Sequence, residues 1–210
     1  MPARPMTVLQ QQQKRRKEPT RPAGQPIQNV LGEDIRPALE AAAQAAQVPL
    51  ELVLACAMAE SGLNPRAERW GTQTRAALAA ISSGDHAQLQ QIIDSAWADV
   101  SFGYGQRIVL YHYAGNRSAS VDNVLAVRQQ VFDNPDQDLM QLAAYLGPAL
   151  TRARDADLSP CGGDELLGAL IIYNSGSMHP PGDPWWTTWQ QNVRNYTDNL
   201  VQARAIVGAS

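Results

Sequence analysis

The most informative stretch of this sequence is Ala-Cys-Ala-Met-Ala-Glu-Ser-Gly-Leu-Asn-Pro, at residues 55–65. It places a single acid, Glu60, at the end of an apolar run and just before a glycine, an asparagine and a proline, which end helices. Upstream, Pro49 suits the first turn of a helix, where its missing N–H would have no partner anyway. The pattern therefore predicts a helix from about Pro49 to Ser61 that closes with a carboxyl group.

Glu60 is predicted to lie half in the core of the protein. At about 100° per residue, it falls on the flank of an expected core face. A carboxyl group that loses hydration has a raised pKa, so it can keep a proton near neutral pH and act as a general acid. The alternative is a solvated acid at a helix end without a chemical role. The expected core face consists of residues at helical spacing: Leu50, Val53, Leu54, Ala57, Met58 and Ser61.

Two later segments combine glycines with polar side chains. Residues 99–106 read Asp-Val-Ser-Phe-Gly-Tyr-Gly-Gln and end in Gln106. Closely spaced glycines let backbone approach a ligand, so Gln106 and backbone amides are candidates to bind sugar N-acetyl and hydroxyl groups. Residues 169–176 predict a helix that ends in Tyr-Asn-Ser-Gly, with Gly176 as the C-terminal stop. The alternatives are a simple glycine-rich turn and a capped helix with a buried tyrosine.

Taken in this order, Glu60-Ser61, Gly103–Gln106 and Ile172–Gly176 resemble motifs of the soluble lytic transglycosylase and goose-type lysozyme superfamily. The family pattern is Glu-Ser, then a Gly-Leu-Met-Gln-like turn, then Ala-Tyr-Asn-x-Gly. The resemblance implies an all-α, lysozyme-like domain that cleaves the β-1,4 bond between N-acetylmuramic acid and N-acetylglucosamine in peptidoglycan, without a cofactor. It covers roughly residues 50–72, 99–115 and 165–200.

The resemblance also implies roles for individual residues. Glu60 would protonate the leaving oxygen and then act as base while the muramic acid 6-hydroxyl attacks, which leaves a 1,6-anhydro end. A single carboxyl group would then suffice, in contrast to the two carboxylates of most glycosidases. Tyr173, Asn174 and Gln106 would position Glu60 and the sugar. The full set of candidate substrate-binding residues is Ser61, Ser101, Tyr104, Gln106, Tyr173 and Asn174.

The chain departs from the family pattern in three ways. Gly105 replaces the methionine of the turn, and Ile172 replaces the alanine before the tyrosine. Two extra helices are predicted between the first two motifs, at about Thr74–Ile81 and His86–Ala98. Arg69 lies near the place where the family often has a serine. These departures leave open a second interpretation, a non-catalytic virion structural protein that keeps the lysozyme-like fold.

A second carboxylate would decide between a transglycosylase and a hydrolase. Ser101 stands where chicken-type lysozymes have an aspartate, and Asp99 is the nearest alternative, followed by Glu68 and Asp85. If Asp99 faced the site with room for a bound water, hydrolysis would be possible. The alternative is that Asp99 caps a turn or a helix end. The transglycosylase mechanism is preferred, and a lysozyme remains the alternative.

Charge is distributed unevenly along the 210 residues. Residues 1–26, predicted to form a basic, Pro/Gln-rich extended arm, carry six basic side chains against one acid, whereas residues 27–210, the predicted catalytic domain, have a net charge of −8. We expect the arm to attach to other virion or tail proteins; the alternatives are a solvated flexible tail and, less favoured, a contact with nucleic acid. The sequence shows no apolar signal segment and no run of about 18 apolar residues. A phage virion (tail), or the host cytoplasm before assembly, is the expected location.

The remaining signals concern packing. Cys56 and Cys161 either form one disulfide or remain two thiols, and the three histidines show no metal-ligand spacing. Trp185 or Trp186 is expected either to stack on a sugar or to pack in the core, and Trp189 is expected to pack. Further helices are predicted near Glu33–Gln47, Val121–Phe132, Leu139–Arg154, Asp164–Tyr173 and Trp185–Val207.

Overall fold

The structure is a computed structural model, and it describes residues 25–96, 99–108, 120–180, 182–188 and 190–208. Nearly all of the predicted arm, residues 1–26, lies outside the described residues, as does Trp189.

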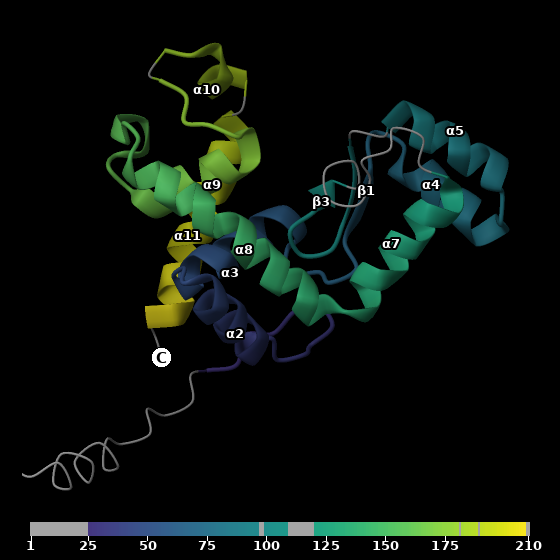
Figure 1. The fold of residues 1–210 in the computed structure, drawn as a ribbon, viewed down its shortest axis with the longest axis horizontal. Coiled ribbons are helices and arrows are strands. Elements are labelled where there is room, and N and C mark those ends of the chain that lie inside the picture. Colours follow the sequence, from purple (N-terminus) through teal and green to yellow (C-terminus); the bar gives the residue numbers. More distant parts are fainter. Residues whose placement is uncertain (1–24, 97–98, 109–119, 181, 189, 209–210) are drawn as a thin grey trace, which may run out of the picture.

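Helices make up most of the fold (Figure 1). The mostly helical character predicted from the sequence is therefore confirmed, and the predicted helix ends are off by at most four residues. The predicted helix at 185–207 is present as two helices. The helices are α2 (Arg36–Ala46), α3 (Leu50–Ser61), α4 (Thr74–Ser83), α5 (His86–Ala96), α7 (Val121–Asp133), α8 (Pro135–Arg154), α9 (Glu165–Ser175), α10 (Pro184–Thr188) and α11 (Gln190–Gly208), with a short 3-10 turn, η2 (Ser159–Cys161).

The fold also contains a small antiparallel sheet, so the expectation of an all-α protein is incomplete. Its strands lie in the order β1 (Glu68–Trp70), β2 (Val100–Phe102) and β3 (Arg107–Ile108). Arg69 lies opposite Ser101 in the register of β1 and β2. Strands of two or three residues are too short to show the alternating pattern by which strands are recognised in sequence.

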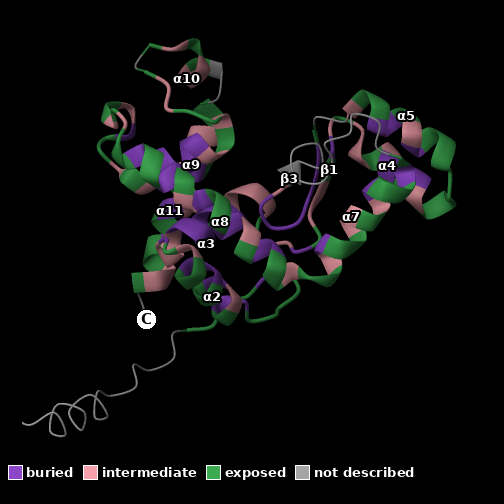
Figure 2. Cartoon of the chain, in the orientation of Figure 1, coloured by how far each residue is buried: buried purple, intermediate pink, exposed green. Residues whose placement is uncertain are grey.

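Helix α3 lies at the centre of the larger part of the molecule. It packs against α2, α8, α9 and α11, and every residue from Leu52 to Ala57 is buried (Figure 2). The expectation of a single core face on this helix is therefore wrong: neighbours cover the middle of α3 on all sides, and Leu50 and Met58 are only partly buried. A helix that is apolar all round is typical of such a central position.

The buried side chains form two separate clusters. The larger cluster surrounds α3 and includes Leu39, Leu142, Leu170 and Leu200 from four neighbouring helices. The smaller cluster joins the sheet to α4, α5 and α7, on the side of the molecule away from α9 and α10 (Figure 1). The ring of Trp70 meets that of Phe102 edge to face at 5.5 Å in the smaller cluster.

Candidate active site

Glu60 lies at the C-terminal end of α3, where the apolar run meets the surface. Glu60 is half-buried, as the sequence predicted. Gly62 ends the helix in the left-handed conformation with φ 61°, and its N–H donates to the carbonyl of Met58 at 2.9 Å. The hydroxyl of Ser61 donates to the carbonyl of Ala57 at 2.7 Å. Ser61 is thus bonded to its own helix, which ends at this residue.

Two side chains from α11 hold this end of α3. The phenol of Tyr196, which is only 4% exposed, donates a hydrogen bond to Oε1 of Glu60. The side-chain amide of Asn195 donates to the carbonyl of Ala59 at 3.1 Å, a group at the end of a helix that needs a partner from outside it. Tyr196 therefore fixes the orientation of the carboxyl group.

Burial raises the pKa of the Glu60 carboxyl group above its usual value. The hydrogen bond from Tyr196 and the positive charge of Arg69 act in the opposite direction and only reduce this rise. Burial and the nearby Glu60 also raise the pKa of Tyr196 well above its usual value, so Tyr196 stays a hydrogen-bond donor. The structure therefore contains the half-buried carboxyl group with a raised pKa that the sequence predicted.

The glycine turn between β2 and β3 is anchored by a buried carboxylate. Asp138, on α8, is 2% exposed and accepts a hydrogen bond from the N–H of Tyr104 at 2.6 Å. Gly103 has φ 81°, and a Cβ at this position would lie only 2.3 Å from Oδ2 of Asp138. Only glycine permits this approach in this conformation. No local signal in the sequence points to Asp138, because the contact spans 34 residues.

Tyr173 connects the third motif to the second. Its hydroxyl, at the end of α9, donates to the carbonyl of Gly105 at 2.8 Å. Helices α3, α9 and α11 contact one another, and Tyr173 joins the end of α9 to the glycine turn.

The other candidate substrate-binding residues differ in accessibility. Ser101 and Tyr104 are buried, and the Tyr104 hydroxyl accepts a hydrogen bond from Asn29 at 3.3 Å. The side chain of Gln106 folds back on the turn: its amide donates to the carbonyl of Gly103 at 3.1 Å, and its oxygen accepts from Ser101 at 3.1 Å. Asn174 is exposed. Ser101 and Tyr104 were predicted to bind the substrate directly. This prediction is wrong for the structure as it stands, because neither side chain reaches the surface.

The candidate second carboxylates have other partners. Asp99 forms an exposed ion pair with Arg69 at 3.7 Å, with both side chains more than half exposed. Glu68 accepts two hydrogen bonds of 2.8 Å from the guanidinium of Arg128. Asp85 accepts from the N–H of Gln88 at the start of α5. Within the described part of the chain, none of these carboxylates contacts Glu60.

Three further features concern the cysteines, possible metal ligands and possible membrane helices. Cys56 and Cys161 are separate buried thiols, which settles the open question of a disulfide. Within the described ranges, no group of histidine, cysteine and carboxylate side chains is arranged to hold a metal ion. No described helix is by itself long and apolar enough to cross a membrane; only α2 and α3 counted together reach that length, and they meet at a bend of 118°.

Comparison with known proteins adds no relative: no protein-family model, no curated protein and no solved structure matches this chain.

Proposed function

We propose that this chain is a peptidoglycan-cleaving glycosidase of the lytic transglycosylase type, with a lysozyme-like fold and Glu60 as its acid–base group. One observation carries the proposal. Glu60 is half-buried, its burial raises the pKa of its carboxyl group, and Tyr196 donates a hydrogen bond to its Oε1. Tyr173 of the third motif contacts the glycine turn of the second, and α9 packs against α3, the helix that carries Glu60, which supports the assignment of the substrate.

The surroundings of Glu60 suit both halves of the reaction. Burial favours the protonated form, which can donate its proton to the glycosidic oxygen as that bond breaks. Tyr196 and Arg69 favour the carboxylate, because both lower the pKa. The carboxylate can then accept the proton of the muramic acid 6-hydroxyl, while the oxygen of that hydroxyl forms a bond to the anomeric carbon. A group in such balanced surroundings can act first as an acid and then as a base.

The partners of the other carboxylates favour the transglycosylase over the hydrolase. An inverting hydrolase needs a second carboxylate to activate water, and a retaining hydrolase needs one as a nucleophile. Asp99 is paired with Arg69, and Glu68 is paired with Arg128. Intramolecular attack by the substrate's own hydroxyl needs no second carboxylate.

Zymography on purified cell wall tests the proposal. Glu60→Gln keeps the size of the side chain and removes the acid, so we expect cleavage to fall by about 10²–10⁴-fold. Glu51→Gln, in the first turn of the same helix, is the matched control and should clear the wall like the wild type. Equal clearing by Glu60→Gln and the wild type would exclude Glu60 as the catalyst. If the wild type does not clear the wall, the non-catalytic structural protein becomes the better interpretation.

Mass analysis of the released muropeptides separates the two enzyme types. A transglycosylase leaves 1,6-anhydro ends, whereas a hydrolase leaves reducing ends that are heavier by one water. Reducing ends alone would replace the transglycosylase by a lysozyme and would require a search for a second carboxylate, beginning with Asp99.

We further propose attachment to a phage particle through the basic segment at residues 1–26. That segment has a net charge of +5, whereas the remainder has −8. Anionic wall polymers attract cations, so an acidic enzyme gains from being carried to the wall by a larger assembly. Mass spectrometry of purified virions should detect the protein, and its absence from particles would favour an enzyme that acts free in the infected cell.

A further inference from the structure

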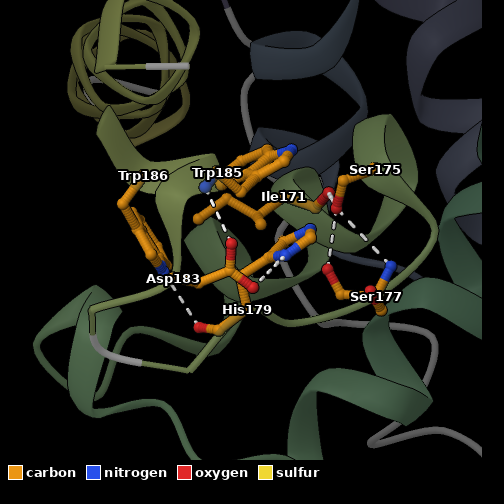
Figure 3. Close-up of polar contacts among 7 residues, drawn as sticks. All are labelled: Ile171, Ser175, Ser177, His179, Asp183, Trp185 and Trp186. Atoms are coloured by element: carbon orange, nitrogen blue, oxygen red, sulfur yellow. Dashed lines mark hydrogen bonds and ion pairs between the residues drawn. The ribbon is translucent and has the colours of Figure 1, made fainter. Parts of the chain in front are cut away.

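The segment that follows α9 forms a compact group of rings around a carboxylate (Figure 3). We call it the aromatic loop cluster; it consists of His179, Asp183, Trp185 and Trp186. The rings of His179 and Trp185 are stacked, with centroids 4.4 Å apart and planes within 2° of parallel. Trp186 meets Trp185 edge on, at 5.3 Å and 87°.

Hydrogen bonds within the aromatic loop cluster fix its rings in place. The indole N–H of Trp186 donates to the carbonyl of His179 at 3.0 Å, and the backbone N–H of Trp185 donates to Asp183 at 2.7 Å. Nδ1 of His179 lies 3.2 Å from the other oxygen of Asp183. Side chains that are ordered before a ligand arrives lose little entropy on binding.

The two indoles of this group pack against the larger hydrophobic cluster, but part of their surface and of Asp183 stays exposed. Both indoles are only half-buried, whereas Trp70 is completely buried in the smaller cluster. Hydrogen bonds from Trp185 and His179 lower the pKa of Asp183, so its partly exposed carboxyl group is ionised at neutral pH. Among the described residues, Nε2 of His179 is buried without a hydrogen-bond partner, on a side chain that is 18% exposed. Unpaired buried polar atoms are uncommon and call for an explanation.

We propose that the aromatic loop cluster is a saccharide-binding subsite. A pyranose ring has an apolar face of C–H groups, which fits a fixed indole surface, and equatorial hydroxyls, which fit the partly exposed Asp183 carboxylate. The segment begins directly after Gly176, at the end of α9 that carries Tyr173. A glycan strand bound near Glu60 can therefore extend onto it. The choice of a sugar as ligand rests on the proposed function.

Titration of tryptophan fluorescence with the N-acetylglucosamine tetramer chitotetraose tests this inference. The measurement uses the full chain with Glu60→Gln, so that the probe is not cleaved. We expect Trp185→Ala to weaken binding by about five- to tenfold, the loss typical of one aromatic contact at a binding site. Trp185→Phe should recover part of the affinity, and Asp183→Asn should also weaken binding. Tyr145→Ala, at an exposed aromatic residue on α8, is the control and should bind like its parent.

The outcomes separate this inference from the proposed function. Absence of chitotetraose binding, or unchanged binding in Trp185→Ala and Asp183→Asn variants with normal circular dichroism, would overturn the subsite even if the wild type clears cell wall. Binding that depends on Trp185 in a protein that does not clear cell wall would support the subsite and reject the enzyme. A response to choline chloride but not to the sugar would also overturn it, because an aromatic group beside a carboxylate can bind a quaternary ammonium ion.

Discussion

The two hydrophobic clusters of this molecule are held together by different means. Around α3, the four helices α2, α8, α9 and α11 bury an apolar helix on all sides, and most of the buried side chains are aliphatic. The cluster around the sheet has fewer apolar side chains, and a bidentate ion pair between Glu68 and Arg128 lies beside them. Arg128 also lies over the ring of Phe132, 4.6 Å from its centroid. The large cluster thus depends on burial, and the small one also on charge and aromatic contacts.

The site draws on both regions. The large cluster supplies the desolvation that raises the pKa of Glu60, whereas the sheet supplies Arg69, which lowers it, and the glycine turn. Asp138 and Tyr173, from α8 and α9, tie the turn to the large cluster. The helical part therefore places the acid and supplies Tyr196, which lowers its pKa, and the smaller part adds the positive charge of Arg69.

The largest expected effect on stability is in the large cluster. Leu54 is fully buried in the middle of α3, so Leu54→Ala should lower the free energy of unfolding by about 2–5 kcal/mol through lost burial and a cavity. Urea denaturation measures this change. Leu78→Ala, at an exposed leucine of α4, is the control and should have little effect. A loss for Leu54→Ala no larger than that of the control would contradict the central role of α3.

A smaller and more local effect is expected from the ion pair. Arg128→Met keeps an apolar side chain beside Phe132 but leaves the mostly buried Glu68 without its cation. We expect a loss of about 1–3 kcal/mol. Hydrogen exchange should become faster in β1 and α7 and remain unchanged in α3. Equal acceleration in α3 would mean that the two clusters do not differ as described. Arg154→Met, which removes a half-exposed pair with Glu165, should change stability by less than about 1 kcal/mol.

The connection between the regions can be weakened without a cavity. Asp138→Asn keeps the shape of the side chain but replaces a charged acceptor for the Tyr104 N–H by a neutral one, so we expect a loss of only about 1 kcal/mol. Because the turn shifts relative to Glu60, wall cleavage should fall more than this loss of stability alone explains. Cleavage assays on the folded variant check this expectation, and unchanged cleavage would show that the anchor serves stability alone.

The sequence located the acid well and its partners poorly. The apolar run before Glu60 and the glycine after it are local signals, and they correctly predicted a half-buried carboxyl group at a helix end. Tyr196 and Asp138 were not found, because each acts through a contact with a distant part of the chain. The accessibility of Ser101 and Tyr104 was misjudged for a related reason. Both residues belong to the motif around the turn, but the burial of that turn depends on distant residues. Asp138 of α8 and Asn29 near the N-terminus both bond to Tyr104.

The raised pKa of Glu60 predicts a pH dependence with a definite sign. The folded state binds this proton more tightly than the unfolded chain, so the contribution of Glu60 to stability falls as the pH rises from the unfolded pKa to the folded one. Relative to Glu60→Gln, the wild type should therefore lose stability over that range. Wall cleavage should also fall as the pH rises past the folded pKa, because the acid must be protonated. A stability difference that increases with pH over that range would contradict this sign.

The most direct test of the central claim is an NMR titration of the Glu60 side-chain carboxyl carbon in the folded protein. The wild type should titrate above the usual glutamate pKa of about 4.3, and Tyr196→Phe should titrate higher still, because it loses a hydrogen bond that favours the carboxylate. A carboxyl group that titrates at or below the usual value would contradict the assignment of Glu60 as a proton-holding acid.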